Sequence, residues 1–268
     1  MVPMPSGIYL QIYLEKVPHV NRMDWLKSHL DQAKGLGVRG IAMHSFVGAM
    51  GTDEFSPLAK LCHERGLQAL AAYGLGKDSN QHPDHAGQWI GEVASHADCD
   101  GVILDAEGQW EDESPSIESE RSLDLRVALR QSAPHALVID QPWPVPTLHW
   151  TAFPWEEFSR CVDIHAPQVY VNDFKKQFGL NRYPNFWSWY EASWYTLETK
   201  RLKPQNLIRP RIPTIQGYSW SDIQADLDDC LVRNHTTIVW CEPFPDEVFI
   251  AALKRLQDRL EDPSCRIY

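Results

Sequence analysis

The chain has 268 residues, of which 43% are hydrophobic, 23% charged and 11% aromatic, the balance of a folded protein that can bury a large core. Its formal net charge is −11, so the average surface repels phosphate backbones and anionic lipid. We therefore expect neither a nucleic acid nor a membrane as a partner.

Short apolar, β-prone runs alternate with longer amphipathic stretches along the whole chain. Eight runs have the composition of strands, and they cover residues 7–13, 38–44, 67–73, 101–107, 136–140, 164–171, 207–214 and 237–242. The stretches between and after them predict eight helices, at residues 21–34, 53–65, 82–97, 117–131, 154–161, 184–201, 221–234 and 246–260. Glycine or proline follows several of these helices, as at Gly35, Gly66 and Pro134.

Eight successive strand-then-helix units predict an α/β fold in which residues 1–268 form a single (β/α)8 barrel, the TIM barrel. Strand interiors such as Val102-Ile103-Leu104 are apolar throughout, as expected for strands covered on both faces. The first turn has no glycine-rich phosphate loop, so we expect no dinucleotide, and nothing else in the sequence calls for a cofactor. The six cysteines lie far apart with no C-x-x-C pair, which predicts free thiols rather than a metal site.

The first residues, Met-Val-Pro-Met-Pro-Ser-Gly, show no basic stretch followed by an apolar core. No apolar run approaches the roughly 20 residues that would span a bilayer. We therefore expect no signal peptide and no membrane anchor, and a protein that is cytoplasmic as synthesised. The sequence predicts no particular oligomeric state.

Polar and aromatic side chains gather where the predicted strands end. Barrel chemistry is built at the carboxyl ends of the strands, so the site should be found among these residues. The expected substrate contacts are His44, Tyr73, Gln168, Tyr218 and Glu242, together with Trp143 and Trp240, whose indole rings can stack on sugars.

Asp105 and Glu107 end the fourth strand, and the period of two points both carboxyl groups the same way, roughly 6.5–7 Å apart along the strand. When two carboxyl groups share a partly dry pocket, one of them can keep its proton and donate it to a leaving oxygen. This is how a glycosidic bond is protonated. The alternative is a solvated turn that merely follows the strand.

Residues 100–107, Asp-Gly-Val-Ile-Leu-Asp-Ala-Glu, resemble the D-G-x-D-x-D-x-E signature on strand four of family 18 glycoside hydrolases, the chitinases and related N-acetylglucosaminidases. Ile103 stands where that family has its first inner aspartate. Gln168-Val169-Tyr170 lies where the family carries Met-x-Tyr-Asp on strand six. Trp240 ends strand eight, where the family keeps a tryptophan under the sugar.

The resemblance implies that Glu107 is the general acid and base. It implies that Asp105 orients and polarises the 2-acetamido group of the substrate, to which Tyr170 donates a hydrogen bond. The acetamido oxygen would attack the anomeric carbon, so no enzyme nucleophile is needed. The implied reaction is the retaining cleavage of a β-1,4-linked N-acetylhexosamine polymer, chitin or peptidoglycan, and the expected partner is such an oligosaccharide or polysaccharide.

A second resemblance is to the family 25 lysozymes of phages and bacteria, which also end strand four with D-x-E and cleave the MurNAc to GlcNAc linkage of peptidoglycan. Residues 7–11 lack the aspartate that this family places on strand one. A cell-wall substrate, together with the expected lack of a signal peptide, would suggest a phage or prophage lysin that is released by another route.

The strand-end residues are also compatible with two classes of protein that are not glycosidases. Ile103, at a family aspartate position, is compatible with a sugar-binding barrel that has lost catalysis. A metal-dependent isomerase or phosphodiesterase would use strand-end ligands, namely His44, Asp105, Glu107, Asp140 and Glu242. Asp140 is either a third acid, acting as nucleophile or water-orienting base, or an aspartate that forms the turn before the prolines.

Overall fold

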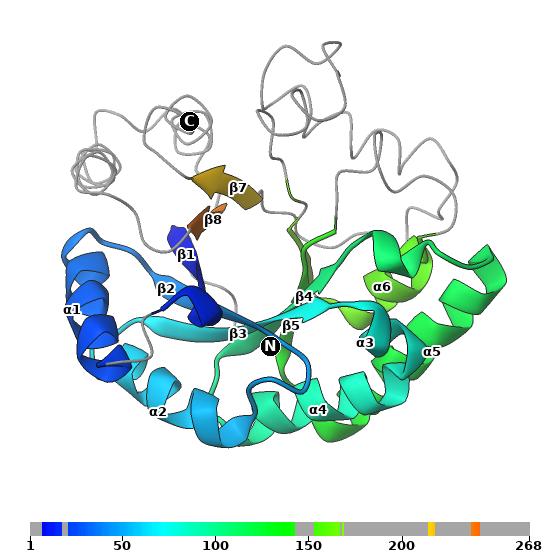
Figure 1. Cartoon of the computed structure of the whole chain (residues 1–268), viewed down its shortest axis with the longest axis horizontal. Helices are drawn as coiled ribbons and strands as arrows, with labels where there is room; N and C mark the ends of the chain where they lie inside the picture. Colours follow the sequence, from blue (N-terminus) through cyan, green and yellow to red (C-terminus); the bar gives the residue numbers. More distant parts are fainter. Residues whose placement is uncertain are drawn as a thin grey trace, which may run out of the picture.

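The structure, a computed structural model, describes residues 7–17, 21–142, 153–166, 168, 214–217 and 237–241 (Figure 1). Eight strands form one sheet in the order β6-β5-β4-β3-β2-β1-β8-β7, and every described pairing is parallel. The described helices follow one another along the outer side of the curved sheet, as Figure 1 shows. This arrangement confirms the predicted (β/α)8 barrel.

The strands are β1 (Ile8–Tyr13), β2 (Gly40–Phe46), β3 (Gln68–Leu75), β4 (Gly101–Ala106), β5 (Leu137–Asp140), β6 (Ile164–His165), β7 (Thr214–Gly217) and β8 (Thr237–Cys241). The described helices are α1 (Arg22–Gly35), α2 (Thr52–His63), α3 (Lys77–Gln81), α4 (Pro83–His96), α5 (Pro115–Ser132) and α6 (Trp155–Cys161). Two 3-10 turns, Leu14–Lys16 and Gly108–Trp110, follow β1 and β4. None of these helices combines the length and the apolar composition that a bilayer crossing requires.

The expected boundaries differ from the observed ones at a few places. β2 and β3 each continue two residues beyond their expected ends, because the β2–β3 ladder extends to the pair Phe46 and Gly74 and the β3–β4 ladder to the pair Leu75 and Ala106. Helix α3 was not expected, since its sequence Lys-Asp-Ser-Asn-Gln has no apolar stripe. β7 begins at Thr214, where the expected strand ends, and residues 207–213 lie outside the described residues. The helices expected at 184–201, 221–234 and 246–260 also lie outside them.

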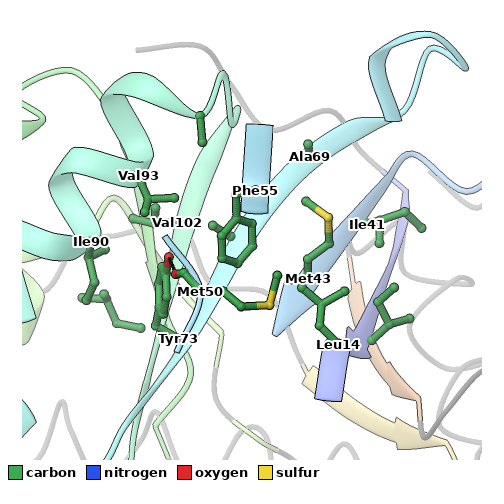
Figure 2. Packing of buried hydrophobic residues seen from close by; sticks show 14 of the residues in the cluster. Leu14, Ile41, Met43, Met50, Phe55, Ala69, Tyr73, Ile90, Val93 and Val102 are labelled. Carbon is green, nitrogen blue, oxygen red and sulfur yellow. Dashed lines mark hydrogen bonds between the residues drawn. The ribbon is translucent and has the colours of Figure 1, made fainter. Parts of the chain in front are cut away.

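The strands separate two apolar cores. The core inside the barrel includes Tyr9, Ala42, Ile103 and Ile139. The core between sheet and helices is larger, and Figure 2 shows part of it, with strand residues such as Val102 and Tyr73 beside Phe55 of α2 and Ile90 of α4. Alternate residues of a strand face opposite sides, so a residue in phase with Ile103 faces the barrel interior. A residue in phase with Val102 faces the helices.

Helices α4 and α5 lie against each other across two glycines of α4. A Cβ atom added to Gly87 would lie 2.3 Å from the Leu125 carbonyl oxygen, and one added to Gly91 would lie 2.5 Å from the Ser132 Cβ. The two backbones can therefore approach this closely only because these positions have no side chain.

Candidate active site

At the carboxyl ends of the strands, the side chains that face the barrel interior change from apolar to polar. Ile103 and Ile139 belong to the interior core, and so does Ala166 just after β6. Two residues further along the chain come Asp105, Gln141 and Gln168. Because the side-chain period of a strand is two, these three polar residues continue the inward-facing columns. They form the floor of a polar site at this end of the barrel.

Gln168 connects the two carboxyl groups that end β4. Its side-chain nitrogen donates to Asp105 Oδ1 at 2.6 Å and to Glu107 Oε1 at 3.1 Å. The main-chain oxygen of Gln141 lies 3.0 Å from the same nitrogen. An amide nitrogen has two hydrogens for these three acceptors, so the hydrogen bonds of the two carboxyl groups depend on each other. Gln168 itself is buried and its backbone nitrogen donates to the Pro142 oxygen at 2.9 Å.

His44 reaches the same carboxylate from β2, two strands away. Its Nε2 lies 3.3 Å from Asp105 Oδ2, and since a carboxylate only accepts, Nε2 carries the hydrogen. The imidazole passes over β3, where the facing positions are Ala72, the register partner of His44, and Gly74, the register partner of Asp105. A Cβ atom on Gly74 would lie 3.4 Å from His44 Cε1. The small side chains on β3 therefore leave room for the imidazole to reach Asp105.

The two carboxyl groups differ in their surroundings. The Asp105 side chain is only 14% exposed, and both of its oxygens face hydrogen-bond donors, from Gln168 and His44. Glu107 lies just past the end of β4 and is partly exposed to solvent. Each carboxylate oxygen has two lone pairs, so Asp105 can accept one further hydrogen bond on each oxygen. The geometry thus combines a fixed acceptor with a neighbouring acid that a ligand can reach.

Aromatic rings surround His44 at the ends of β1 and β2. The ring centroids of Tyr13 and His44 are 4.1 Å apart, and Phe46 meets His44 edge-on at 5.5 Å. Phe46 remains 42% exposed although it is a large apolar side chain. Tyr13 and Phe46 were not expected in the site, although both lie in phase with the inward-facing residues of their strands.

Amides also line the site at β1. Gln141 Nε2 donates to Gln11 Oε1 at 2.7 Å, and both side chains are buried. Gln11 follows Tyr9 by two residues, so it is the inward-facing position of β1 at this level. Gln11 was not expected in the site. Its signal in the sequence is a polar residue two positions after an inward-facing aromatic one.

Asp140 does not belong to this group, which corrects the expectation of a third acid at the strand ends. It lies in phase with Val138, whose side chain faces the helices, and it is fully buried. Both Asp140 oxygens lie 2.8 Å from His165 Nδ1, and His165 Nε2 lies 3.0 Å from the Ser159 hydroxyl of α6. Asp140 therefore fixes β5, β6 and α6 to one another, on the side of the sheet away from Asp105.

Tyr73 also points away from the site. It is fully buried against Phe55 in the core between sheet and helices, and its hydroxyl donates to the Met50 oxygen at 2.9 Å (Figure 2). Burial raises the pKa of this phenol. The expected contact of Tyr73 with substrate is therefore corrected to a structural hydrogen bond.

Of the remaining expected site residues, one lies in a described strand and four lie outside the described residues. Trp240 is in β8, and its Cα is the register partner of Gln11. The others lie outside the described residues, namely Trp143, Tyr170, Tyr218 and Glu242. Within the described ranges, no three His, Cys, Asp or Glu side chains are grouped so that they could hold a metal ion.

No family model matches the sequence, and neither does any curated protein. Solved structures do match. An endo-β-1,4-mannanase from Thermotoga petrophila has a TM-score of 0.68 at 12% identity, over 96% of this chain and 78% of that one. GH5_18 from Streptomyces cattleya, in complex with GlcNAc, has a TM-score of 0.65 at 11% identity, over 96% of this chain and 82% of that one.

A GH18 chitinase from Pseudoalteromonas aurantia matches 94% of this chain over 100% of its own length, with a TM-score of 0.57 and 14% identity. At such identities the likeness establishes the fold. The chain therefore has the (β/α)8 barrel fold that is found in these glycoside hydrolases.

Proposed function

We propose that the protein is a retaining glycoside hydrolase that cleaves β-1,4-linked N-acetylhexosamine polymers of the chitin or peptidoglycan type, with assistance from the substrate's acetamido group. The observation that carries the proposal is the pair Asp105 and Glu107, joined by one amide nitrogen at the carboxyl end of the barrel. The resemblance of residues 100–107 to the family 18 signature supports it. So do the chitinase and the GlcNAc complex among the structural neighbours.

In the first step, Glu107 donates its proton to the glycosidic oxygen as the bond from that oxygen to the anomeric carbon breaks. The acetamido carbonyl oxygen of the same sugar forms a new bond to the anomeric carbon from the opposite face. Asp105 accepts a hydrogen bond from the acetamido N–H, which turns that carbonyl oxygen toward the carbon. Its negative charge stabilises the positive charge that develops on the ring so formed.

In the second step, water attacks the anomeric carbon and the bond to the acetamido oxygen breaks. Glu107, now a carboxylate, takes the proton of the water. Two displacements at one carbon return the original configuration, so the product keeps the β anomer. Glu107 ends the cycle protonated, and Asp105 ends it unchanged.

The contacts of Asp105 suit this role. His44 and Gln168 each donate to one of its oxygens, so the carboxylate is held in one orientation before substrate arrives. In the sequence, Ile103 replaces the inner aspartate that the family 18 pattern places behind this residue. The imidazole of His44 supplies a polar partner from another strand instead. Asp105 therefore still has a hydrogen-bond donor at Oδ2, although the family aspartate is absent.

The family 25 alternative expects an acid on strand one. The inward-facing residue of β1 at the level of the site is Gln11, an amide bound to Gln141. This position supplies no carboxylate, which favours assistance by the acetamido group over a mechanism with a second enzyme acid.

Release of reducing sugar from chitin and from peptidoglycan tests the proposal, with Glu107→Gln beside the parent. Loss of the general acid should lower the rate by about 10²–10⁴-fold. Glu120→Gln is the matched control, because Glu120 is an exposed acid on α5, and it should retain the parental rate. NMR of the first product should show the β anomer. A parent that cleaves neither polymer, or a fully active Glu107→Gln, would overturn the proposal.

A further inference from the structure

A cavity of about 300 Å³ lies beside the candidate active site, at the carboxyl ends of β2 and β3. Its lining includes Phe46, Gly74, Lys77, Asp78 and Ser79. This volume is at the lower end of the range for small-molecule sites, about 300–1,000 Å³, and suits one sugar unit. Nothing in the proposed mechanism uses it.

Gly74 places the cavity next to the catalytic groups. The Cα of Gly74 is the register partner of the Asp105 Cα, so the two residues lie on adjacent strands about 4.8 Å apart. A polymer that crosses Asp105 and Glu107 and continues over β3 therefore meets the cavity within about one further unit. The cavity and the site belong to the same end of the barrel.

Phe46 forms one wall and has the properties of a stacking platform. It is 42% exposed, while its ring lies at 90° to the His44 ring with 5.5 Å between the centroids. Gly74 allows this position, because a Cβ atom there would lie 2.7 Å from Phe46 Cε1. The ring is thus supported from behind and presents apolar surface to the cavity. An exposed aromatic ring at the mouth of a polar site is the kind of surface on which a sugar face packs.

The lining also contains polar residues. Lys77 and Asp78 are exposed, and Ser79 is buried. An ammonium group, a carboxylate and a hydroxyl together supply both donors and acceptors for sugar hydroxyl groups. An apolar ring and several polar groups in one lining match the two kinds of surface on a pyranose ring.

We infer that this cavity is a further sugar subsite, in which a unit of the bound polymer beyond the cleavage point stacks on Phe46 and bonds to the polar groups of residues 77–79. The inference rests on the proposed function for the identity of the polymer. Stacking would remove roughly 50 Å² of the exposed Phe46 ring from water, equivalent to about a tenfold change in affinity.

The experiment compares kcat/KM for a five-unit β-1,4-linked N-acetylglucosamine substrate and for the aryl glycoside of a single N-acetylglucosamine, which is too short to reach the cavity. In Phe46→Ala the ratio of the long to the short value should fall about tenfold. Phe46→Trp, which keeps an aromatic face, should restore the parental ratio. Val127→Ala is the matched control, since Val127 is 43% exposed on α5 and does not line the cavity.

A parental ratio in Phe46→Ala, with a parent that cleaves both substrates, would overturn the subsite and leave the proposed function standing. A parent that cleaves neither substrate would overturn the proposed function, and the subsite with it. An equal fall of the ratio in Phe46→Ala and Phe46→Trp would also overturn the inference, because the aromatic face would then not matter.

Discussion

Replacing Gln168 by leucine removes the amide that joins the two carboxyl groups and keeps a side chain of similar size. The lost hydrogen bonds are 2.6 Å to Asp105 and 3.1 Å to Glu107. A hydrogen bond to a charged group contributes about 1.5–3 kcal/mol. Asp105 is only 14% exposed, so water replaces the lost donor poorly. We expect the free energy of unfolding to fall by about 3 kcal/mol, mostly from the shorter bond.

Urea denaturation of the parent and the variant measures this change. Gln88→Leu is the control, because Gln88 donates to Glu92 at 2.8 Å on the exposed side of α4, and its loss should cost less than about 0.5 kcal/mol. In Gln168→Leu, kcat/KM should also fall by about 100-fold, since the two carboxyl groups are no longer held at fixed positions relative to each other. Equal losses of stability in the two variants would refute the reasoning that a buried amide holds Asp105.

Three further predictions concern the rest of the described structure. Asp140→Leu should lower the free energy of unfolding by about 3 kcal/mol, because His165 loses its buried partner, while kcat of the folded enzyme stays within about threefold; loss of activity at parental stability would contradict this. Gly87→Ala should lower the free energy of unfolding, measured by urea denaturation, by about 2 kcal/mol, because the new methyl group overpacks the contact between α4 and α5. Gly35→Ala should be neutral or stabilising, because a Cβ atom at Gly35 has no neighbour within 4 Å. Equal effects of the two substitutions would contradict the close packing at Gly87. Burial raises the pKa of the Cys62 and Cys161 thiols to about 12, so the reactive thiolate is scarce at pH 8. Mass spectrometry of the folded protein should therefore find both cysteines unmodified by iodoacetamide. Alkylation at the rate of a free thiol would contradict this burial.

The barrel could be predicted because each strand and helix carries its own local signal, repeated eight times. Asp105 and Glu107 could be paired for a similar reason, since a period of two needs only the strand itself. Asp140 could not be assigned a side in the same way. Its strand, Leu-Val-Ile-Asp, is apolar at every preceding position, so the sequence holds no alternation that shows which face is inward.

The contacts that complete the site depend on pairings between distant strands. His44 reaches Asp105 only because the β2–β3 and β3–β4 registers place Ala72 and Gly74 beneath its ring. Gln168 reaches both carboxyl groups across 61 and 63 residues of sequence. Local patterns do not contain such registers, although they do identify the polar residues that end each strand.

The role of Glu107 as proton donor can be tested with a leaving group that needs no proton. We propose to measure, for parent and Glu107→Gln, the initial cleavage of an N-acetylglucosamine oligosaccharide and of the corresponding 2,4-dinitrophenyl glycoside. The variant should lose about 10²–10⁴-fold on the oligosaccharide and much less on the dinitrophenyl substrate, whose leaving group departs as a stable anion. Equal losses on the two substrates, or no loss on either, would show that Glu107 is not the acid.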